Sequence, residues 1–494
     1  MLLNSLTPSQ FVLAIISSGP TTRKSLSARL IVPKRLFRVF TVAICASPVC
    51  GWCQANQSSA PPLSPLDQIP PVELPATVPA TGQLSLSLAL QLGLRQNPQI
   101  AAAKSSIVSA RENYNSQKAP INPYFTYGAL NDEVAPGNWQ QGFTEGENYV
   151  FYYTLETNGA QKYRARQARE QLHQAEFDAR TTGLSLSLSI IDAYVNLQIA
   201  NRALEVELKI YDNMIKLGDL TNKRYLSGAG TQADAIRAHI AAIQEKQNVI
   251  LDVANVNSAR AALRNQMGLS QDAPVDAIEP LVYKADLAGN LADLTRRAEL
   301  SRPELHSAIA NLDSLKAVPG LARSQYYPDL FVAKDLGNDP YLWVGINIPF
   351  DLGSIRGQVR KAEADVKTQQ AQVELERQNV DLDVKSSYIN LVAAQKQVAT
   401  YDAGVLSMSE TLVDQIRHGY ELGANTIVDI VTAENTYRSV ESAYYIAVGN
   451  YVQALYTLRH SIGDLPDAFS TSTFSSSNLA PSAAVPAAQT ATQK

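Results

Sequence analysis

Cysteine is almost absent from this chain of 494 residues, and all three cysteines lie near the N-terminus. Three basic residues precede an apolar run from Val39 to Trp52, and the run is followed by Cys53-Gln54-Ala55, an ending with small residues at its first and last positions. This order is typical of an export signal, so we predict a signal peptide over residues 1–55 and a mature chain without disulfides or thiolate sites. The alternative is a disordered arm that stays in the mature chain. The residues concerned are Cys45, Cys50, Cys53, Lys34, Arg35 and Arg38.

Patterns that support catalysis or metal binding are lacking as well. The sequence has no Gly-rich phosphate loop and no serine elbow, and Gly228-Ala229-Gly230 lacks the strand and the spacing of a dinucleotide site. No two histidines are three or four residues apart, as a helical zinc site requires; they are His173, His239, His306, His418 and His460. We therefore predict that the protein is not an enzyme and needs no cofactor or metal.

Long hydrophobic runs and excess positive charge are also missing. The longest apolar stretch, residues 39–52, is shorter than the roughly 20 residues that a spanning helix needs. The net charge is −4 for the whole chain and −10 for residues 56–494, which disfavours a nucleic-acid binder. A membrane β-barrel stays possible, because strands with alternating faces leave the mean hydropathy near zero, here −0.12.

Composition sets the limits of the folded part. Residues 56–82 hold seven prolines, which predict an extended linker, and residues 464–494 are rich in Ser, Ala and Thr, which predicts a disordered tail. Between them the chain repeats itself. Asn97-Pro98 matches Arg302-Pro303 at an offset of 205, and Gly159 and Gly228 match Gly353 and Gly423 at 194 and 195. A duplicated unit therefore explains the core.

Within each copy, small and apolar residues recur every three or four positions over a very long segment. This predicts helices from Gly159 to about Arg224 and from Gly353 to about His418, each of 66 residues and roughly 100 Å long. Shorter helices, Pro98–Lys118 and Thr231–Gly268, would together match the first long helix if they stack end to end. One continuous hairpin is the alternative, but strand signals after residue 118 oppose it.

Between short and long helices the period changes to two, which predicts four strands in two hairpins. Aromatic residues gather at the strand ends, as at the interfaces of a membrane barrel. A small soluble sheet with an aromatic core is the alternative. Because even the smallest barrels need about eight strands, a membrane-spanning form would have to oligomerise. The strands are Tyr124–Leu130, Tyr149–Leu155, Pro328–Lys334 and Tyr341–Phe350, and the aromatic residues are Tyr124, Tyr127, Tyr149, Phe151, Tyr152, Tyr153, Tyr326, Tyr327, Tyr341 and Trp343.

Several of these motifs resemble those of the TolC-like outer-membrane efflux proteins. The most specific is the segment from Tyr420 to Ile430, YELGANTIVDI, which is similar to the family's turn at the periplasmic tip of the second hairpin; its counterpart runs from Tyr225 to Asp234. The resemblance covers residues 83–463. It implies a first efflux repeat at 83–270, an equatorial connection at 271–300 and a second repeat at 301–463.

The resemblance also implies a fold class and a function. The fold would be mainly α, with duplicated long-helix hairpins that form a trimeric α-helical tunnel and with four strands from each protomer in a 12-stranded membrane barrel. The function would be that of a passive homotrimeric channel in outer-membrane lipid, with its tunnel in the periplasm. An inner-membrane efflux pump and a periplasmic adaptor would dock onto it, and no nucleic acid would be bound.

Site residues follow from the same resemblance. Asp429 and Thr432 would form the pore gate, although the family's best-known members carry a second aspartate where this chain has Thr432. They also carry an arginine where this chain has Asn425, so an ion pair to Asp234 across neighbouring hairpins would be lost. The tips that contact the adaptor would comprise Tyr225, Gly228, Thr231, Asp234, Tyr420, Gly423, Asn425 and Thr426.

The residues leave two alternatives open. Thr426-Ile427-Val428-Asp429 has the form of a helix capping box, and the segment from Thr231 to Asp234 repeats it, so both acids could simply cap helices. The whole chain could instead be a soluble periplasmic coiled-coil adaptor or chaperone. An adaptor, however, would carry one hairpin with lipoyl-like and barrel modules rather than a duplicated unit with aromatic strands.

Overall fold

The structure is a computed structural model that describes residues 73–74, 82–121, 123–129, 147–284, 289–336 and 342–469. The predicted signal peptide, residues 1–55, and nearly all of the predicted linker lie outside the described residues. The helices are α1 Leu86–Gln96, α2 Pro98–Lys118, α3 Ala160–Leu226, α4 Gln232–Met267, α5 Leu291–Ser301, α6 Pro303–Leu315, α7 Val318–Ser324, α8 Leu352–Thr400, α9 Leu406–Glu421 and α10 Ile427–Ser461.

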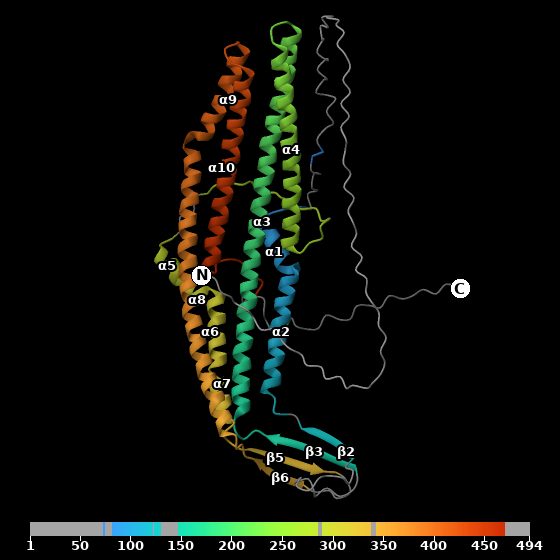
Figure 1. The fold of residues 1–494 in the computed structure, drawn as a ribbon, viewed down its shortest axis with the longest axis vertical. Coiled ribbons are helices and arrows are strands. Elements are labelled where there is room, and N and C mark those ends of the chain that lie inside the picture. The colour runs from blue at the N-terminus through green and yellow to red at the C-terminus, as the bar shows by residue number, and fades with distance from the viewer. Residues whose placement is uncertain are drawn as a thin grey trace, which may run out of the picture. The chain divides into compact units, whose positions relative to one another are not determined.

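The first long helix is confirmed: α3 has 67 residues, and α2 and α4 pack along its two halves (Figure 1). The end of α4 meets the start of α2, where the Asn97 Nδ2 donates to the Gln266 carbonyl at 2.7 Å. Gly268 ends α4 with a φ of 71°, and a Cβ there would lie 2.8 Å from the Asn97 Cα. Only glycine permits both the positive φ and this close approach. The contact between the end of α4 and the start of α2 shows that the two short helices stack end to end, as predicted.

The second long helix differs from the prediction because it is interrupted. After α8, residues Tyr401–Val405 form a π-helical turn in which Gly404 has a φ of 114°, and α9 continues to Glu421. The extra residue of this turn moves the buried positions on by one. Ser409 and Val413 are buried, whereas Met408 and Leu412, which continue the pattern of threes and fours from α8 in the sequence, are exposed.

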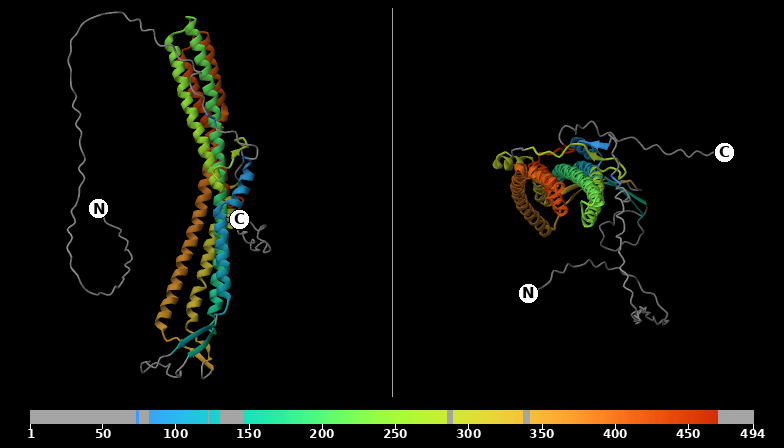
Figure 2. Two further views of the ribbon diagram at one scale, coloured as in Figure 1. Left: turned by 90° about the vertical axis from the view of Figure 1, so that its right-hand side faces the viewer. Right: turned by 90° about the horizontal axis from the view of Figure 1, so that it is seen from above.

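The second copy follows the plan of the first copy, with shorter helices packed along a long one. α6, α7 and α10 pack along α8, and α10 also packs on α3, so the two copies lie side by side (Figure 2). One 18-residue window of α3 reaches a mean hydropathy of 1.2, and 56% of that window is buried by the fold. Its apolar residues therefore belong to the core of the helical layer.

The four strands are β2 Tyr124–Ala129, β3 Glu147–Leu155, β5 Asp329–Asp335 and β6 Leu342–Asn347. They form one antiparallel sheet in the order β2-β3-β5-β6, so the two predicted hairpins are confirmed and pair through β3 and β5. The sheet lies at the N-terminal ends of α3 and α8, which begin shortly after β3 and β6 (Figure 1). The side chains of Tyr127, Tyr149 and Tyr341 lie outside the described part.

The middle of the helical layer is closed by short elements that the sequence patterns did not predict. β1, Gln83–Leu84, pairs in parallel with β4, Asp276–Ala277. The buried Tyr194 of α3 donates its hydroxyl to the Leu84 carbonyl at 2.9 Å. α1 and α5 were also not predicted as separate helices. β4 and α1 pack on α3, and α5 packs on α8.

The predicted disordered tail, residues 464–494, begins too early. Residues 464–469 are described and pack on α3, with Leu465 and Phe469 buried. The Ser187 hydroxyl donates to the Pro466 carbonyl at 2.6 Å, and Arg180 pairs with Asp467. The region as a whole is rich in Ser, Ala and Thr, so its composition did not indicate that the first six residues pack on the helices. Residues 470–494 lie outside the described part of the chain.

Candidate functional site: the helical tips and the strand sheet

Both long hairpins turn at their tips in the same way. In the second tip, Gly423 has a φ of 80°, its N–H donates to the Tyr420 carbonyl, and the Ala424 N–H donates to the Gly419 carbonyl at 2.7 Å. In the first tip, Gly228 has a φ of 76°. This is the Schellman ending of a helix, in which glycine takes the left-handed conformation. The turn predicted from the duplicated glycines is therefore present twice.

Each return helix begins with the predicted threonine cap. The Thr426 hydroxyl accepts from the Asp429 N–H at 3.4 Å, and the Thr426 N–H donates to the Asp429 carboxylate at 2.8 Å, which completes a capping box. The Thr426 N–H and the Thr426 hydroxyl, the latter at 2.7 Å, both donate to the Asp429 carboxylate and lower its pKa below the usual value. Thr231 caps α4 by accepting from the Asp234 N–H at 3.2 Å. The Asp429 carboxylate thus completes the cap of α10, whereas the Asp234 carboxylate accepts from the Thr231 hydroxyl.

The Asp429 carboxylate lies on an exposed face of α10, together with Thr432. The Thr432 hydroxyl donates to the Val428 carbonyl at 2.8 Å. On the opposite side of α10, Ile430, Ala433 and Tyr437 are buried among α3, α4 and α9. Within this protomer the face with Asp429 and Thr432 is left uncovered.

Asn425 has a local role that the sequence did not indicate. Its Nδ2 donates to the Ile416 carbonyl at 3.1 Å, and its side chain lies where a Cβ on Gly419 would be, only 2.3 Å away. Asn425 therefore closes the tip of its own hairpin. Asp234 accepts from Thr231 and pairs with Arg237 at 3.6 Å.

The two tips contact each other through Arg224, which was not among the predicted site residues. Its Nη1 donates to the Tyr420 carbonyl at 3.0 Å, and its guanidinium lies 5.0 Å from the centre of the Tyr420 ring. Tyr420 is buried, whereas its counterpart Tyr225 is half-exposed. Burial is the main cause that raises the pKa of the Tyr420 phenol. The two tyrosines hold matching positions in the repeat, but among the described residues it is Tyr420 that Arg224 of the other tip contacts.

Below the tips the copies are held together by charged groups between helices. Arg438 of α10 pairs with Glu207 of α3 at 3.0 Å and with Glu245 of α4, and both carboxylates are buried. One turn away, Arg417 of α9 pairs at 2.7 Å with the buried Glu434. These contacts join all four helices of the tip half.

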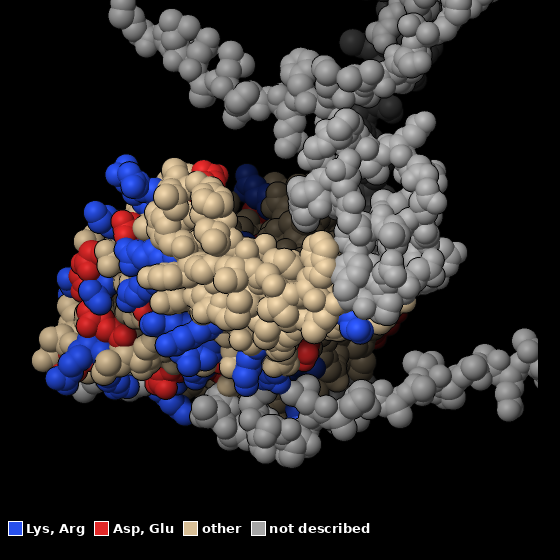
Figure 3. Space-filling view, turned by 90° about the horizontal axis from the view of Figure 1, so that it is seen from below, with Lys and Arg blue, Asp and Glu red and all other residues tan. Residues whose placement is uncertain are grey.

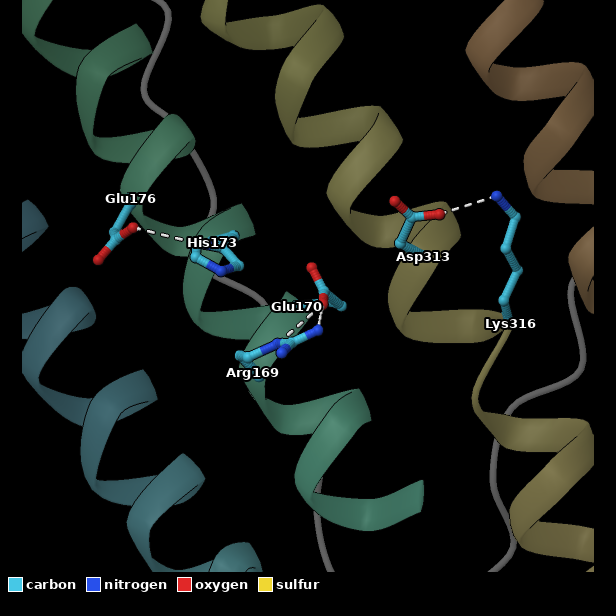
Figure 4. A network of polar contacts seen from close by, with 6 residues as sticks. All are labelled: Arg169, Glu170, His173, Glu176, Asp313 and Lys316. Atoms are coloured by element: carbon cyan, nitrogen blue, oxygen red, sulfur yellow. Dashed lines mark hydrogen bonds and ion pairs between the residues drawn. The ribbon is translucent and has the colours of Figure 1, made fainter. Parts of the chain in front are cut away.

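On the sheet side of the helical layer, several ion pairs form within single helices (Figure 4). On α3 the Arg169–Glu170 pair spans 2.7 Å and the His173–Glu176 pair 3.4 Å. On α6 Lys316 pairs with Asp313 at 2.8 Å. Such exposed pairs contribute little to stability. Pairs between helices occur in this half as well, because Arg323 of α7 pairs with Glu363 of α8 and Arg302 pairs with Asp383 of α8 at 2.7 Å.

The sheet has two different faces, which the strand register defines. Residues directly opposite each other share a face. On one face Tyr124, Tyr152 and Phe331 stack, with ring centres 5.0 and 5.3 Å apart, and Gly345 leaves room for the Phe331 ring. The other face is apolar, and among its described side chains only Lys334 is charged. The apolar face comprises Phe125, Phe151, Tyr153, Leu155, Leu330, Val332, Leu342, Val344 and Ile346.

The sheet is open at both sides within the described part of the chain, since β2 and β6 each pair on one side only. On β6, Leu342, Val344 and Ile346 are 57–69% exposed. A row of unpaired backbone groups beside exposed apolar side chains is a template for another strand. One chain therefore leaves both an apolar face and two strand edges uncovered.

The sequence matches the outer membrane efflux protein family over residues 89–269 and 294–464, which covers both copies. The chain belongs to the outer membrane efflux protein family. The predicted family, its mainly helical fold and its place in the outer membrane are thereby confirmed, and the soluble adaptor or chaperone alternative is wrong. The family consists of channel proteins rather than enzymes.

Relatives and solved structures agree with this assignment. The cobalt-zinc-cadmium resistance protein CzcC of Cupriavidus metallidurans is 21% identical over 78% of this chain and 91% of its own. The outer membrane efflux protein BepC of Brucella suis is 22% identical over 74% and 80%. The fusaric acid resistance protein FusA of Burkholderia cepacia is 24% identical, but the match spans only 42% of its length and 47% of this chain.

Two solved channels share the fold of this efflux protein. The VceC protein from Vibrio cholerae has a TM-score of 0.63 at 18% identity, over 76% of this chain and 96% of that one. The CmeC channel of Campylobacter jejuni has a TM-score of 0.65 at 14% identity, over 81% and 96%. Helical hairpins with a four-stranded sheet are thus the fold of this family.

Proposed function

We propose that this efflux protein acts as a homotrimeric duct, in which three sheets close into one 12-stranded barrel and three helical layers form a periplasmic tunnel. The observation that carries the proposal is the sheet with two open edges and an exposed apolar face. Pairing β2 of one protomer with β6 of the next would satisfy both edges and turn the apolar face toward lipid. The chain itself would catalyse no reaction.

A disulfide scan tests the barrel, because a mature chain without the first 55 residues has no cysteine of its own. Phe125→Cys on the edge strand β2 is combined in turn with Leu342→Cys, Val344→Cys and Ile346→Cys on β6. We expect one combination to give crosslinked dimers and trimers in outer-membrane fractions. The control is Phe125→Cys with Val332→Cys on the inner strand β5, which should stay uncrosslinked between chains. A soluble monomer would overturn the duct.

The proposed duct would work with an inner-membrane pump and a periplasmic adaptor. The names of relatives refer to cobalt, zinc and cadmium, to fusaric acid and to pyoverdine export. Similar chains are thus associated with unlike compounds, which supports a passive channel whose pump selects the substrate. No group of three His, Cys, Asp or Glu that could hold a metal ion occurs among the described residues.

The proposed adaptor contact is formed by the two tips. Around Gly228 and Gly423 no atom lies within 4 Å of the place a Cβ would take, so both glycines leave open surface beside the turn. We expect Gly423→Trp to abolish capture of the adaptor, while Gly423→Ala, which imposes the same strain at positive φ without the bulk, should retain it. Equal capture by both variants would remove Gly423 from the contact.

The proposed gate is a ring of three Asp429 carboxylates at the periplasmic mouth, with Thr432 beside it. The face of α10 that carries both residues is uncovered in the protomer, and three like charges at one mouth would attract cations. Asp429 would hold this role in addition to capping α10.

Asp234 supplies the matched control for the gate, since it holds the same place in the first turn of α4, three residues after the capping threonine Thr231. Asp429→Asn and Asp234→Asn should therefore cause a similar small loss of stability. In planar bilayers only Asp429→Asn should lower cation selectivity and change the conductance. If both variants or neither changed the selectivity, Asp429 would be a capping residue alone.

A further inference from the structure

Cations gather where α3 and α8 begin, directly after the strands. The first ten residues of α3 hold four cations and no acid, and the first ten of α8 hold three cations and no acid. A helix N-terminus carries partial positive charge, so cations there are unfavourable and acids are preferred. The starts of both long helices thus carry cations where acids would be stabilising.

Some of these cations are neutralised within the chain and some are not. Arg164 pairs with Glu156 at 2.6 Å, Arg169 with Glu170 and Lys361 with Asp365. The others are exposed and form no ion pair with the described residues. They make up what we call the basic collar: Lys162, Arg166, Arg356 and Arg360.

The basic collar is part of the duplication. Lys162 matches Arg356 and Arg166 matches Arg360 at the same offset of 194 residues that relates Gly159 to Gly353. In each copy the two cations are four residues apart, so they lie on one face of the helix. The same unfavourable charge thus occurs twice, which indicates an anion outside the chain.

The collar lies next to the apolar sheet. Seen from the sheet end, Lys and Arg, with Asp and Glu among them, border one side of an uncharged surface (Figure 3). Arg360 is nine residues into α8, so the collar lies within about 12 Å of the helix starts. The headgroup layer of a bilayer extends roughly 5–8 Å beyond its hydrocarbon core. Side chains of Lys and Arg reach across that interval, because their charged ends extend toward headgroups.

We propose that the basic collar binds the phosphate groups of anionic phospholipids at the periplasmic boundary of the outer membrane. The inference rests on the proposed function, since it places the apolar face of the sheet in lipid. Guanidinium groups bind phosphate with two hydrogen bonds, and each cation near an anionic surface adds about 1 kcal/mol, or about fivefold in affinity. Three protomers would present twelve such groups around the barrel.

The test measures which lipids the full chain retains. The protein is reconstituted in nanodiscs of equal parts phosphatidylglycerol and phosphatidylcholine, extracted in neutral detergent and assayed for bound lipid by mass spectrometry. We expect at least fivefold enrichment of phosphatidylglycerol, reduced toward the bulk ratio in 0.5 M NaCl because salt screens exposed charges. No enrichment in a trimer that conducts ions in planar bilayers would overturn this inference and leave the duct intact.

Variants assign the enrichment to the collar. K162Q/R166Q/R356Q/R360Q should lose it. The charge-matched control, R95Q/K223Q/R297Q/K396Q, removes four exposed cations from α1, α3, α5 and α8 and should keep it. If the fourfold variant fails to assemble, K162Q/R166Q and R356Q/R360Q should each lose part of the enrichment. Unchanged lipid together with altered ion selectivity would place the collar in the channel lumen and overturn the proposal.

Discussion

At the scale of single residues, the buried pair Glu207 and Glu245 carries the clearest electrostatic signal in the tip half. Burial, with the hydrogen bond to Glu245, raises the pKa of Glu207 to about 8, although Arg438 opposes the shift. Hydrogen bonds from Glu207 and Arg438 outweigh burial at Glu245 and lower its pKa. The pair therefore keeps one proton to a higher pH than a free carboxyl would, and the remaining carboxylate balances Arg438.

This proton makes stability depend on pH. The folded pKa of Glu207 lies above its usual value of 4.5, so its contribution is complete below about pH 4.5 and is lost as the pH rises to about 8. In the wild type this group makes the free energy of unfolding fall with pH by at most about 1.4 kcal/mol per pH unit. Glu207→Gln should remove that slope, so the free energies of unfolding at pH 5 and pH 8 should differ less than in the wild type. The control Glu245→Gln should be the more damaging change at pH 7. An unaltered slope in Glu207→Gln would contradict the assignment.

The residue scale also shows how far the sequence could predict the site. Thr426 and Asp429 are three residues apart, and their capping box depends on local geometry alone, so the pattern was sufficient. The role of Asn425 depends on a carbonyl nine residues earlier and on the close approach to Gly419. Arg224 contacts Tyr420 across 196 residues. Contacts of that kind leave no local pattern in a single sequence.

At the scale of elements, the π-helical turn at Gly404 distinguishes the second long helix from the first. Periodicity predicted a continuous helix because one extra residue disturbs a pattern of threes and fours only slightly. No side chain other than hydrogen takes a φ of 114° without strain. The turn therefore depends on Gly404.

Gly404→Ala should destabilise the protein by about 1–3 kcal/mol, or straighten the helix and shift the seam beyond it. The control is Gly357→Ala in α8, where φ is ordinary and no atom lies within 4 Å of the new Cβ, so it should stabilise by up to about 1 kcal/mol. Thermal unfolding of both variants compares them. Equal effects of the two substitutions would show that the conformation of Gly404 is not needed.

At the scale of the whole molecule, duplication accounts for most of what the sequence predicted. The offset between copies located α2, α3, α4 and the four strands, because each repeat has the same order of helix, hairpin and long helix. Patterns within a copy could not predict the contacts between copies. Arg438, for example, meets Glu207 and Glu245 only because α10 lies against α3. α1 and α5, each of 11 residues, were not predicted as separate helices.

The two faces of the sheet provide the test at this scale. Val344 is on the apolar face, and Thr154, one position away in the register, is on the face with the stacked rings. If the apolar face contacts lipid, Val344→Lys should cost about 2–4 kcal/mol near the bilayer midplane, whereas Thr154→Lys should be tolerated. Trimer yield in outer-membrane fractions and the urea midpoint of the folded trimer measure the difference. Equal tolerance of the two lysines would mean that the sheet lies outside the membrane, because only a lipid boundary makes opposite faces of one sheet differ so strongly in their response to charge.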